Sequence, residues 1–74
     1  MKAMPTTEIL GLARKHLPRA YPMFDQARLC IIDAEKFAEA GNDRWARTFA
    51  LRALALCVGI WHRDYEAATH GERS

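Results

Sequence analysis

A single glycine between two amphipathic stretches places the strongest constraint on this fold. Through the stretch 22–40, apolar residues recur at alternating steps of four and three, which is the spacing of one helix face. They are Met23, Ala27, Cys30, Ala34 and Phe37. Gly41 can end this helix, because glycine accepts a positive φ at no steric cost. Asn42 or Asp43 can cap a following helix over 43–67. The sequence therefore predicts an antiparallel helical hairpin.

The apolar positions of the two predicted helices also agree in register. If the turn at Gly41 is tight, residues whose numbers sum to about 87 lie opposite one another. Ala34 then meets Ala53, and Cys30 meets Cys57. Two facing alanines would let the helix backbones approach closely. Because pattern and register agree, the hairpin is favoured beyond helix propensity alone.

A shorter helix is expected before the hairpin, over 7–17. A hydroxyl from Thr6 or Thr7 can cap its free N–H groups. Pro18 ends it, because the residue before a proline avoids the helical region. Pro22 suits the first turn of the next helix, where a missing N–H costs nothing.

We therefore expect an all-α fold, a short N-terminal helix followed by the long hairpin, in one domain spanning 1–74. The segments 1–5 and 70–74 are expected to be flexible. A chain of 74 residues buries a modest fraction of its surface, so its core is marginal. Small domains of this kind often gain stability from a partner chain, which favours a dimeric form of the three-helix bundle.

The predicted third helix is apolar on more than one face. One stripe can pack against the second helix, and another follows a heptad-like spacing of three and four. The second stripe consists of Leu51, Leu54, Val58, Trp61 and Tyr65. We expect it to bind a protein partner or a second copy as a homodimer, with Trp45 as a further anchor. The alternative is that the three-helix packing buries the whole stripe.

One part of the hairpin resembles a known helical repeat. The matching residues are small Ala34, aromatic Phe37, the turn glycine Gly41, and then Ala46, Ala53 and Leu54. On these residues the stretch Ala34–Leu54 resembles one tetratricopeptide repeat. It departs from that pattern at Asp33, where the family prefers leucine, and no proline follows the second helix. The resemblance implies close packing of two antiparallel helices and a role in protein interaction.

Four arginines of the third helix suggest a different partner. They are Arg44, Arg47, Arg52 and Arg63. With Trp45 and Trp61 close by, they could contact phosphates and stack on bases, as in a small nucleic-acid-binding regulator. The alternative is an ordinary solvated face, because acidic residues are interleaved and the net charge is only +2.

Two further groups of residues have possible chemistry. His62 and Glu66 lie four residues apart with Asp64 between them, a spacing that can supply two metal ligands or a simple solvated helix end. Cys30 and Cys57 are either a thiol pair or two buried small apolar residues. We expect the simpler interpretation in both cases, and so predict no metal and no cofactor.

The remaining features argue against catalysis and membrane insertion. The sequence has neither a glycine-rich phosphate loop nor a Ser-His-Asp order. Its longest apolar run, 53–61, is too short to span a bilayer, and no signal-peptide core precedes it. We therefore predict a cytoplasmic, non-catalytic protein-interaction or adaptor module. The alternative is a small nucleic-acid-binding accessory protein.

Overall fold

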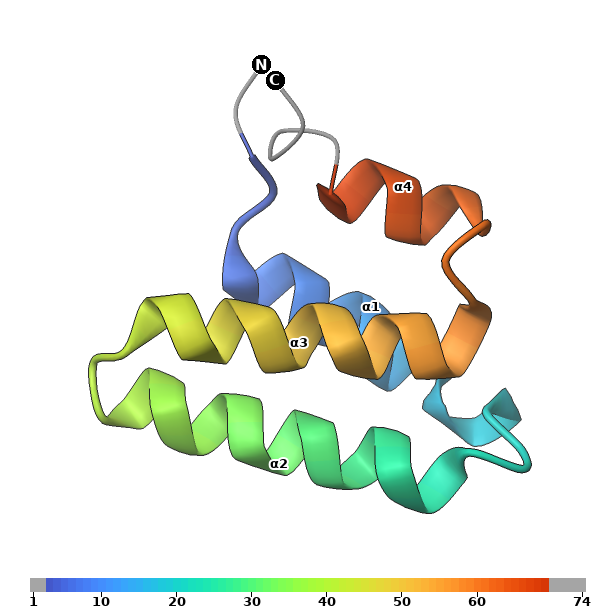
Figure 1. Ribbon diagram of the computed structural model, residues 1–74, viewed down its shortest axis with the longest axis horizontal. Helices are drawn as coiled ribbons and strands as arrows, with labels where there is room; N and C mark the ends of the chain where they lie inside the picture. The colour runs from blue at the N-terminus through green and yellow to red at the C-terminus, as the bar shows by residue number, and fades with distance from the viewer. Residues whose placement is uncertain (1–2, 70–74) are drawn as a thin grey trace.

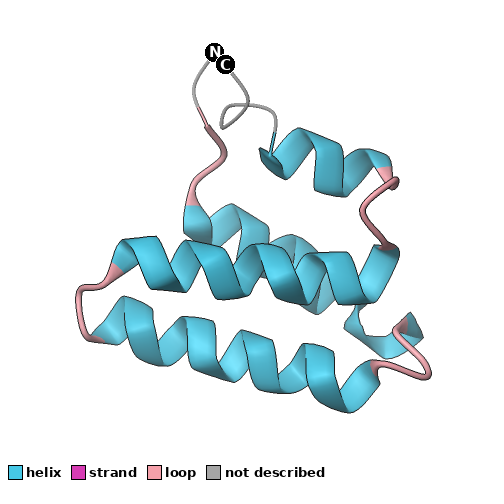
Figure 2. Cartoon of the chain, in the orientation of Figure 1, coloured by secondary structure: helices cyan, strands magenta, loops and turns pink. Residues whose placement is uncertain are grey.

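The computed structural model describes residues 3–69 of the chain, which form four α-helices and one short 3-10 helix (Figure 1). In chain order these are α1 (Thr6–His16), η1 (Leu17–Arg19), α2 (Phe24–Glu39), α3 (Asp43–Val58) and α4 (Arg63–Thr69). The described residues contain no strand (Figure 2), so the all-helical prediction is confirmed for them. Of the segments expected to be flexible, 1–2 and 70–74 lie outside the described residues.

Helices α2 and α3 lie side by side and run in opposite directions (Figure 1). Gly41 connects them with a φ of 78°, the left-handed conformation expected of a glycine at a helix end. The Asn42 side chain accepts a hydrogen bond from the Trp45 N–H at 3.2 Å, so Asn42 is the N-cap of α3. The turn thus forms through the two residue types that the sequence supplies for it.

Alanines dominate the buried positions of this hairpin. Both helices contribute fully buried members, and these are Ala27, Ala34, Ala46, Ala50 and Ala53. Near the turn, the rings of Phe37 and Phe49 stack with their centroids 5.4 Å apart. Small side chains therefore occupy the hairpin interior, and aromatic side chains lie at its turn end.

Helix α1 lies behind the hairpin in Figure 1 and completes the core. It contributes Ile9, Leu10 and Ala13, which pack in one cluster with Leu54 of α3. Ile9 and Leu54 are the largest fully buried side chains of the described residues. The Thr6 hydroxyl, expected to cap α1, instead donates to the Asp43 carboxylate at 2.9 Å. This bond joins the first residues of α1 and α3.

The predicted single helix over 43–67 is wrong, because the chain breaks it in two. Helix α3 ends at Val58, and Gly59 follows with φ 88° and ψ 154°, which no helix residue adopts. The segment from Gly59 to His62 reverses the chain, and α4 passes back over α3 (Figure 1). The fold therefore contains a fourth helix that periodicity did not predict.

The other helix limits differ from the prediction by one or two residues. Helix α1 covers Thr6–His16 rather than 7–17, and η1 continues the turn past it. Helix α2 begins at Phe24 instead of Pro22, because Pro22 lies in the connection rather than in the first helical turn.

Candidate functional site

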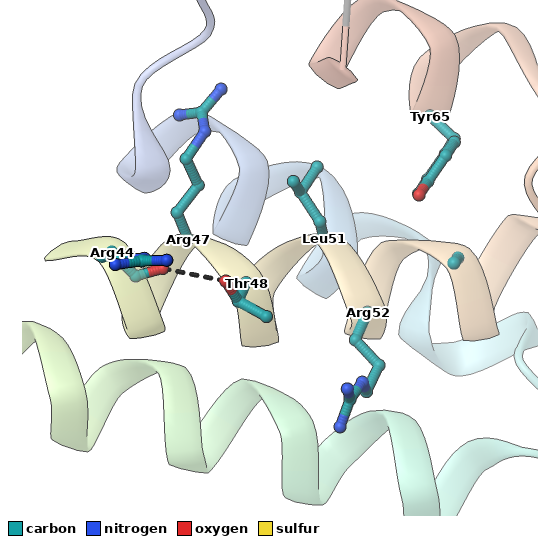
Figure 3. A pocket seen from close by; sticks show the side chains of 7 residues that line it. Arg44, Arg47, Thr48, Leu51, Arg52 and Tyr65 are labelled. Atoms are coloured by element: carbon teal, nitrogen blue, oxygen red, sulfur yellow. Dashed lines mark hydrogen bonds between the residues drawn. The ribbon is translucent and has the colours of Figure 1, made fainter. Parts of the chain in front are cut away.

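A depression of about 510 Å³ lies between α3 and α4 (Figure 3). We call it the arginine groove. Its lining residues come from α3, except for one tyrosine of α4. They are Arg44, Arg47, Thr48, Leu51, Arg52, Ala55 and Tyr65. In Figure 3 the Tyr65 ring extends from α4 toward α3.

Helical periodicity explains why these side chains gather. Arg44, Thr48 and Arg52 are four residues apart and form one row along α3. Leu51 and Ala55 belong to the neighbouring row, which begins at Arg47. Because the break after α3 returns α4 over these rows, Tyr65 lies above side chains that are 10 to 14 positions earlier in the sequence. The groove therefore has one polar row, a second row that consists of Arg47, Leu51 and Ala55, and an aromatic wall.

The charge of the groove is entirely positive, since none of its seven lining residues is acidic. Arg47 is held by the protein itself, donating to the backbone carbonyls of Met4 and Ala68. The Arg52 guanidinium lies over the Phe49 ring, 5.2 Å from its centroid, and remains exposed. Arg44 is exposed as well. Arg44 and Arg52 are thus exposed to solvent, whereas Arg47 links α3 to the residues before α1 and to α4.

The interface residues predicted as a heptad seam do not form one helical face, although Leu51 and Tyr65 both line the arginine groove. Leu54 is completely buried in the core of its own chain. Leu51 and Val58 are half-buried against that core. Because α3 ends at Val58, Trp61 lies in the loop and is 90% exposed, whereas Tyr65 lies on another helix. The seam as one continuous helical face is therefore wrong.

Three of the four arginines predicted to contact nucleic acid line the groove together. Arg63 is the exception; it is the first residue of α4 and does not line the groove. Thr48 and Ala55 were not predicted as site residues. Their spacing of four from Arg44 and Leu51 could have indicated both.

Trp45, predicted as an interface anchor, is 49% exposed. Its ring centroid lies 6.2 Å from that of Phe37 and 6.4 Å from that of Phe49. Since Phe49 also supports Arg52, this aromatic cluster adjoins the arginine groove. Trp45 is therefore partly fixed by its own chain and partly available to a partner.

A second cluster ties the start of α4 to the end of α1. Nε2 of His16 donates to the Asp64 carboxylate at 2.7 Å, because an ionised carboxylate only accepts. Nδ1 of His62 accepts from the Asp64 backbone N–H at 3.0 Å, and the two imidazole rings pack edge to face. The hydrogen bond from His16 lowers the pKa of Asp64, and the positive charge of Lys15 lowers it further.

The structure does not arrange His62 and Glu66 with other ligands as a metal site would require. His62 immediately precedes α4, and its backbone carbonyl accepts the Glu66 N–H at 3.0 Å. Within residues 3–69, no group of three or more His, Cys, Asp or Glu side chains is arranged to hold a metal ion.

The two cysteines are free and half-buried. Burial raises the pKa of both thiols, and Cys30 raises that of Cys57 further. The Cys57 thiol also lies 3.6 Å from the carbonyl of Ala13. Since a raised pKa keeps both groups as thiols at neutral pH, neither is an activated nucleophile.

Replacing Asp64 with asparagine should lower the melting temperature at pH 7. The folded chain lowers the pKa of this carboxyl. The contribution of Asp64 to the free energy of unfolding is therefore complete above the ordinary aspartate pKa of about 3.9. This contribution is lost as the pH falls through the lowered pKa. Thermal melts followed by circular dichroism should show the difference between wild type and Asp64→Asn shrinking as the pH falls below the ordinary aspartate pKa. Glu66→Gln, an exposed carboxyl on the same helix, is the control; equal behaviour of the two variants would contradict the role of Asp64.

Comparison with known proteins yields no matching family model, no similar curated protein and no similar solved structure. The resemblance to a tetratricopeptide repeat thus rests on the residues quoted for it. No helix among residues 3–69 is long and apolar enough to cross a membrane.

Proposed function

We propose that this chain is a non-catalytic helical interaction module whose binding surface is the arginine groove, and that its partner is an acidic segment of another protein. One observation carries the proposal. Two exposed arginines, Arg44 and Arg52, line a depression that also has apolar lining residues and no acidic one; Arg52 extends toward α2 in Figure 3. Such a surface attracts carboxylates and at the same time buries apolar side chains.

The composition of the surface favours a protein partner. Arginine, tyrosine and tryptophan are the residue types that contribute most to protein interfaces. Here Arg44, Arg52 and Tyr65 line the groove, and half-exposed Trp45 belongs to the adjoining aromatic cluster. The resemblance of Ala34–Leu54 to a protein-interaction repeat agrees with this proposal.

Reversing the two free charges of the groove should abolish partner capture. We expect Arg44→Glu combined with Arg52→Glu to lose proteins that tagged wild type retains from native extract, because carboxylates would then face carboxylates. The matched control is Arg19→Glu with Arg28→Glu, which changes the net charge equally at exposed sites outside the groove. Quantitative mass spectrometry after nuclease treatment measures retention. Identical retention by the groove and control variants would refute the groove as the binding surface.

Nucleic-acid binding is the second candidate function. The observation that favours it is that Arg44, Arg47 and Arg52 line one groove together with an aromatic ring, Tyr65. Stacking on such a ring and contacts with phosphates are how single strands are held. A gel-shift titration over a salt series tests this candidate, because phosphate contacts weaken steeply with salt. Nuclease-sensitive capture in the preceding experiment would favour it as well.

The sequence predicts a homodimer through the seam; we propose instead that two copies would meet through the α3–α4 loop. The predicted seam is divided, but Ile60 and Trp61 of the α3–α4 loop are 53% and 90% exposed. Exposed large apolar residues of this kind often mark contacts between chains. Sedimentation velocity at micromolar concentration tests self-association, and a strictly monomeric chain would eliminate it.

A further inference from the structure

We infer that the arginine groove accepts an acidic amphipathic helix whose two carboxylates, about two helical turns apart, pair with Arg44 and Arg52 across an apolar side chain. This inference rests on the proposed function and specifies its partner. It follows from the spacing of the charges, the nature of the surface between them and the way Arg47 is already used.

The spacing of the two exposed arginines sets the length of the partner. Arg44 and Arg52 are eight residues apart on one straight helix, which separates their backbones by about 12 Å. On a second helix, positions about seven or eight residues apart are separated by roughly 10–12 Å on one face. Two carboxylates at that spacing can therefore reach both guanidiniums at once. Carboxylates four residues apart reach only one.

The surface between the arginines determines what lies between the two carboxylates. Thr48 and Leu51 lie between Arg44 and Arg52 along α3, and the Tyr65 ring extends toward α3 from α4 (Figure 3). Helices that bind in grooves anchor themselves with apolar side chains three or four residues apart. The fitting segment therefore has an acidic residue, an apolar residue three or four positions later, and a second acidic residue after a similar step.

The state of Arg47 favours this helix over a nucleic acid. Arg47 donates to the carbonyls of Met4 and Ala68, so it serves to hold the fold together. The groove then offers two guanidiniums in a chain of net charge +2. Dedicated nucleic-acid surfaces neutralise about six or more phosphates. Two charges with Leu51 between them along α3 match a short acidic helix better.

A designed peptide tests the inference directly. The probe is a fluorescein-labelled, alanine-rich helix of about 16 residues with two glutamates seven apart and leucines at the two central positions between them. Fluorescence anisotropy with the full chain measures its affinity. We expect binding that weakens at least about tenfold in Arg44→Gln combined with Arg52→Gln, because charge-assisted hydrogen bonds are lost. The matched control, Arg19→Gln with Arg28→Gln, should bind as wild type does.

Two more peptides and one more variant make the result specific. A peptide with glutamine for both glutamates, and one with the glutamates four apart, should each bind at least about tenfold more weakly. The pair Arg44→Lys and Arg52→Lys keeps both charges and should recover part of the affinity lost with glutamine. Full affinity for the glutamine peptide, or for the four-apart peptide, would overturn the inference.

A single-stranded oligothymidine of about 15 nucleotides completes the experiment. If it binds the groove more tightly than the peptide and displaces it, the occupant is a nucleic acid and the inference is wrong. If wild type binds no peptide at all, the inference is also wrong. In that case the proposed function still holds when extract proteins are retained by wild type and lost from the charge-reversed groove variant. Failure of both experiments refutes both statements.

Discussion

Replacing Leu54 with alanine should lower the free energy of unfolding by about 2–5 kcal/mol. Leu54 is completely buried and packs in the core with Ile9 and Leu10 of α1. Removing its isopropyl group loses the transfer free energy of that group and leaves a cavity that the surrounding helices fill only in part. A small domain is stable by roughly 5–15 kcal/mol, so this loss is a large share of the total.

Leu29 provides the matched control, since its side chain is 54% exposed on α2. Leu29→Ala removes the same atoms but opens no cavity, so the change should stay within about 0.5 kcal/mol. Urea unfolding followed by circular dichroism measures both variants. If Leu54→Ala unfolds at the same urea concentration as Leu29→Ala, Leu54 does not belong to the core. It would then again be a candidate for the seam predicted from the sequence.

Two glycine-to-alanine substitutions should change stability in opposite directions. Gly59→Ala should cost about 1–3 kcal/mol, because the φ of 88° and ψ of 154° are accessible essentially to glycine alone. Gly11→Ala should add about 0.4–1 kcal/mol, because Gly11 lies inside α1 and alanine loses less entropy there. In both cases the added methyl group would meet no atom within 4 Å.

The backbone conformation of each glycine alone therefore decides whether its replacement by alanine raises or lowers the free energy of unfolding. Urea unfolding of both variants measures it, and NMR chemical shifts at 59–62 report whether the break between α3 and α4 persists. Equal stability of Gly59→Ala and wild type would show that the break does not require a glycine. The α3–α4 arrangement that forms the arginine groove would then need a different explanation.

The hairpin turn was predictable because its determinants are local. Gly41 supplies the positive φ and Asn42 supplies the cap, and both act within a few residues of the turn. The all-helical class was predictable for a similar reason, since the apolar spacing of α2 is visible in one short stretch. Such features depend little on the rest of the chain.

The break at Gly59 was missed because the apolar pattern continues through it. Val58, Trp61 and Tyr65 keep a helical spacing in the sequence, although the chain reverses between the first and the last of them. A glycine inside a helical pattern either stays in the helix, as Gly11 does, or ends it. Tertiary packing of α4 against α3 decides between the two, and that packing is not local.

The candidate site was predictable only in part, for the same reason. The arginines of α3 share a helix face, so their proximity follows from spacing. Tyr65 joins them only because α4 turns back, and the role of Arg47 depends on the distant carbonyls of Met4 and Ala68. The charges of the groove can thus be predicted from the sequence. The position of Tyr65 and the hydrogen bonds of Arg47 depend on long-range contacts and cannot.

The fully buried alanines of α2 and α3 also affect how this chain can vary. A core of large side chains is damaged mostly by truncation, as at Leu54, but an alanine has almost nothing to truncate. At positions such as Ala34 and Ala53, nearly every substitution adds atoms to a space that has no room for them. The hairpin interior therefore sets an upper limit on side-chain size at these positions. We expect homologous chains to vary there only among glycine, alanine and serine.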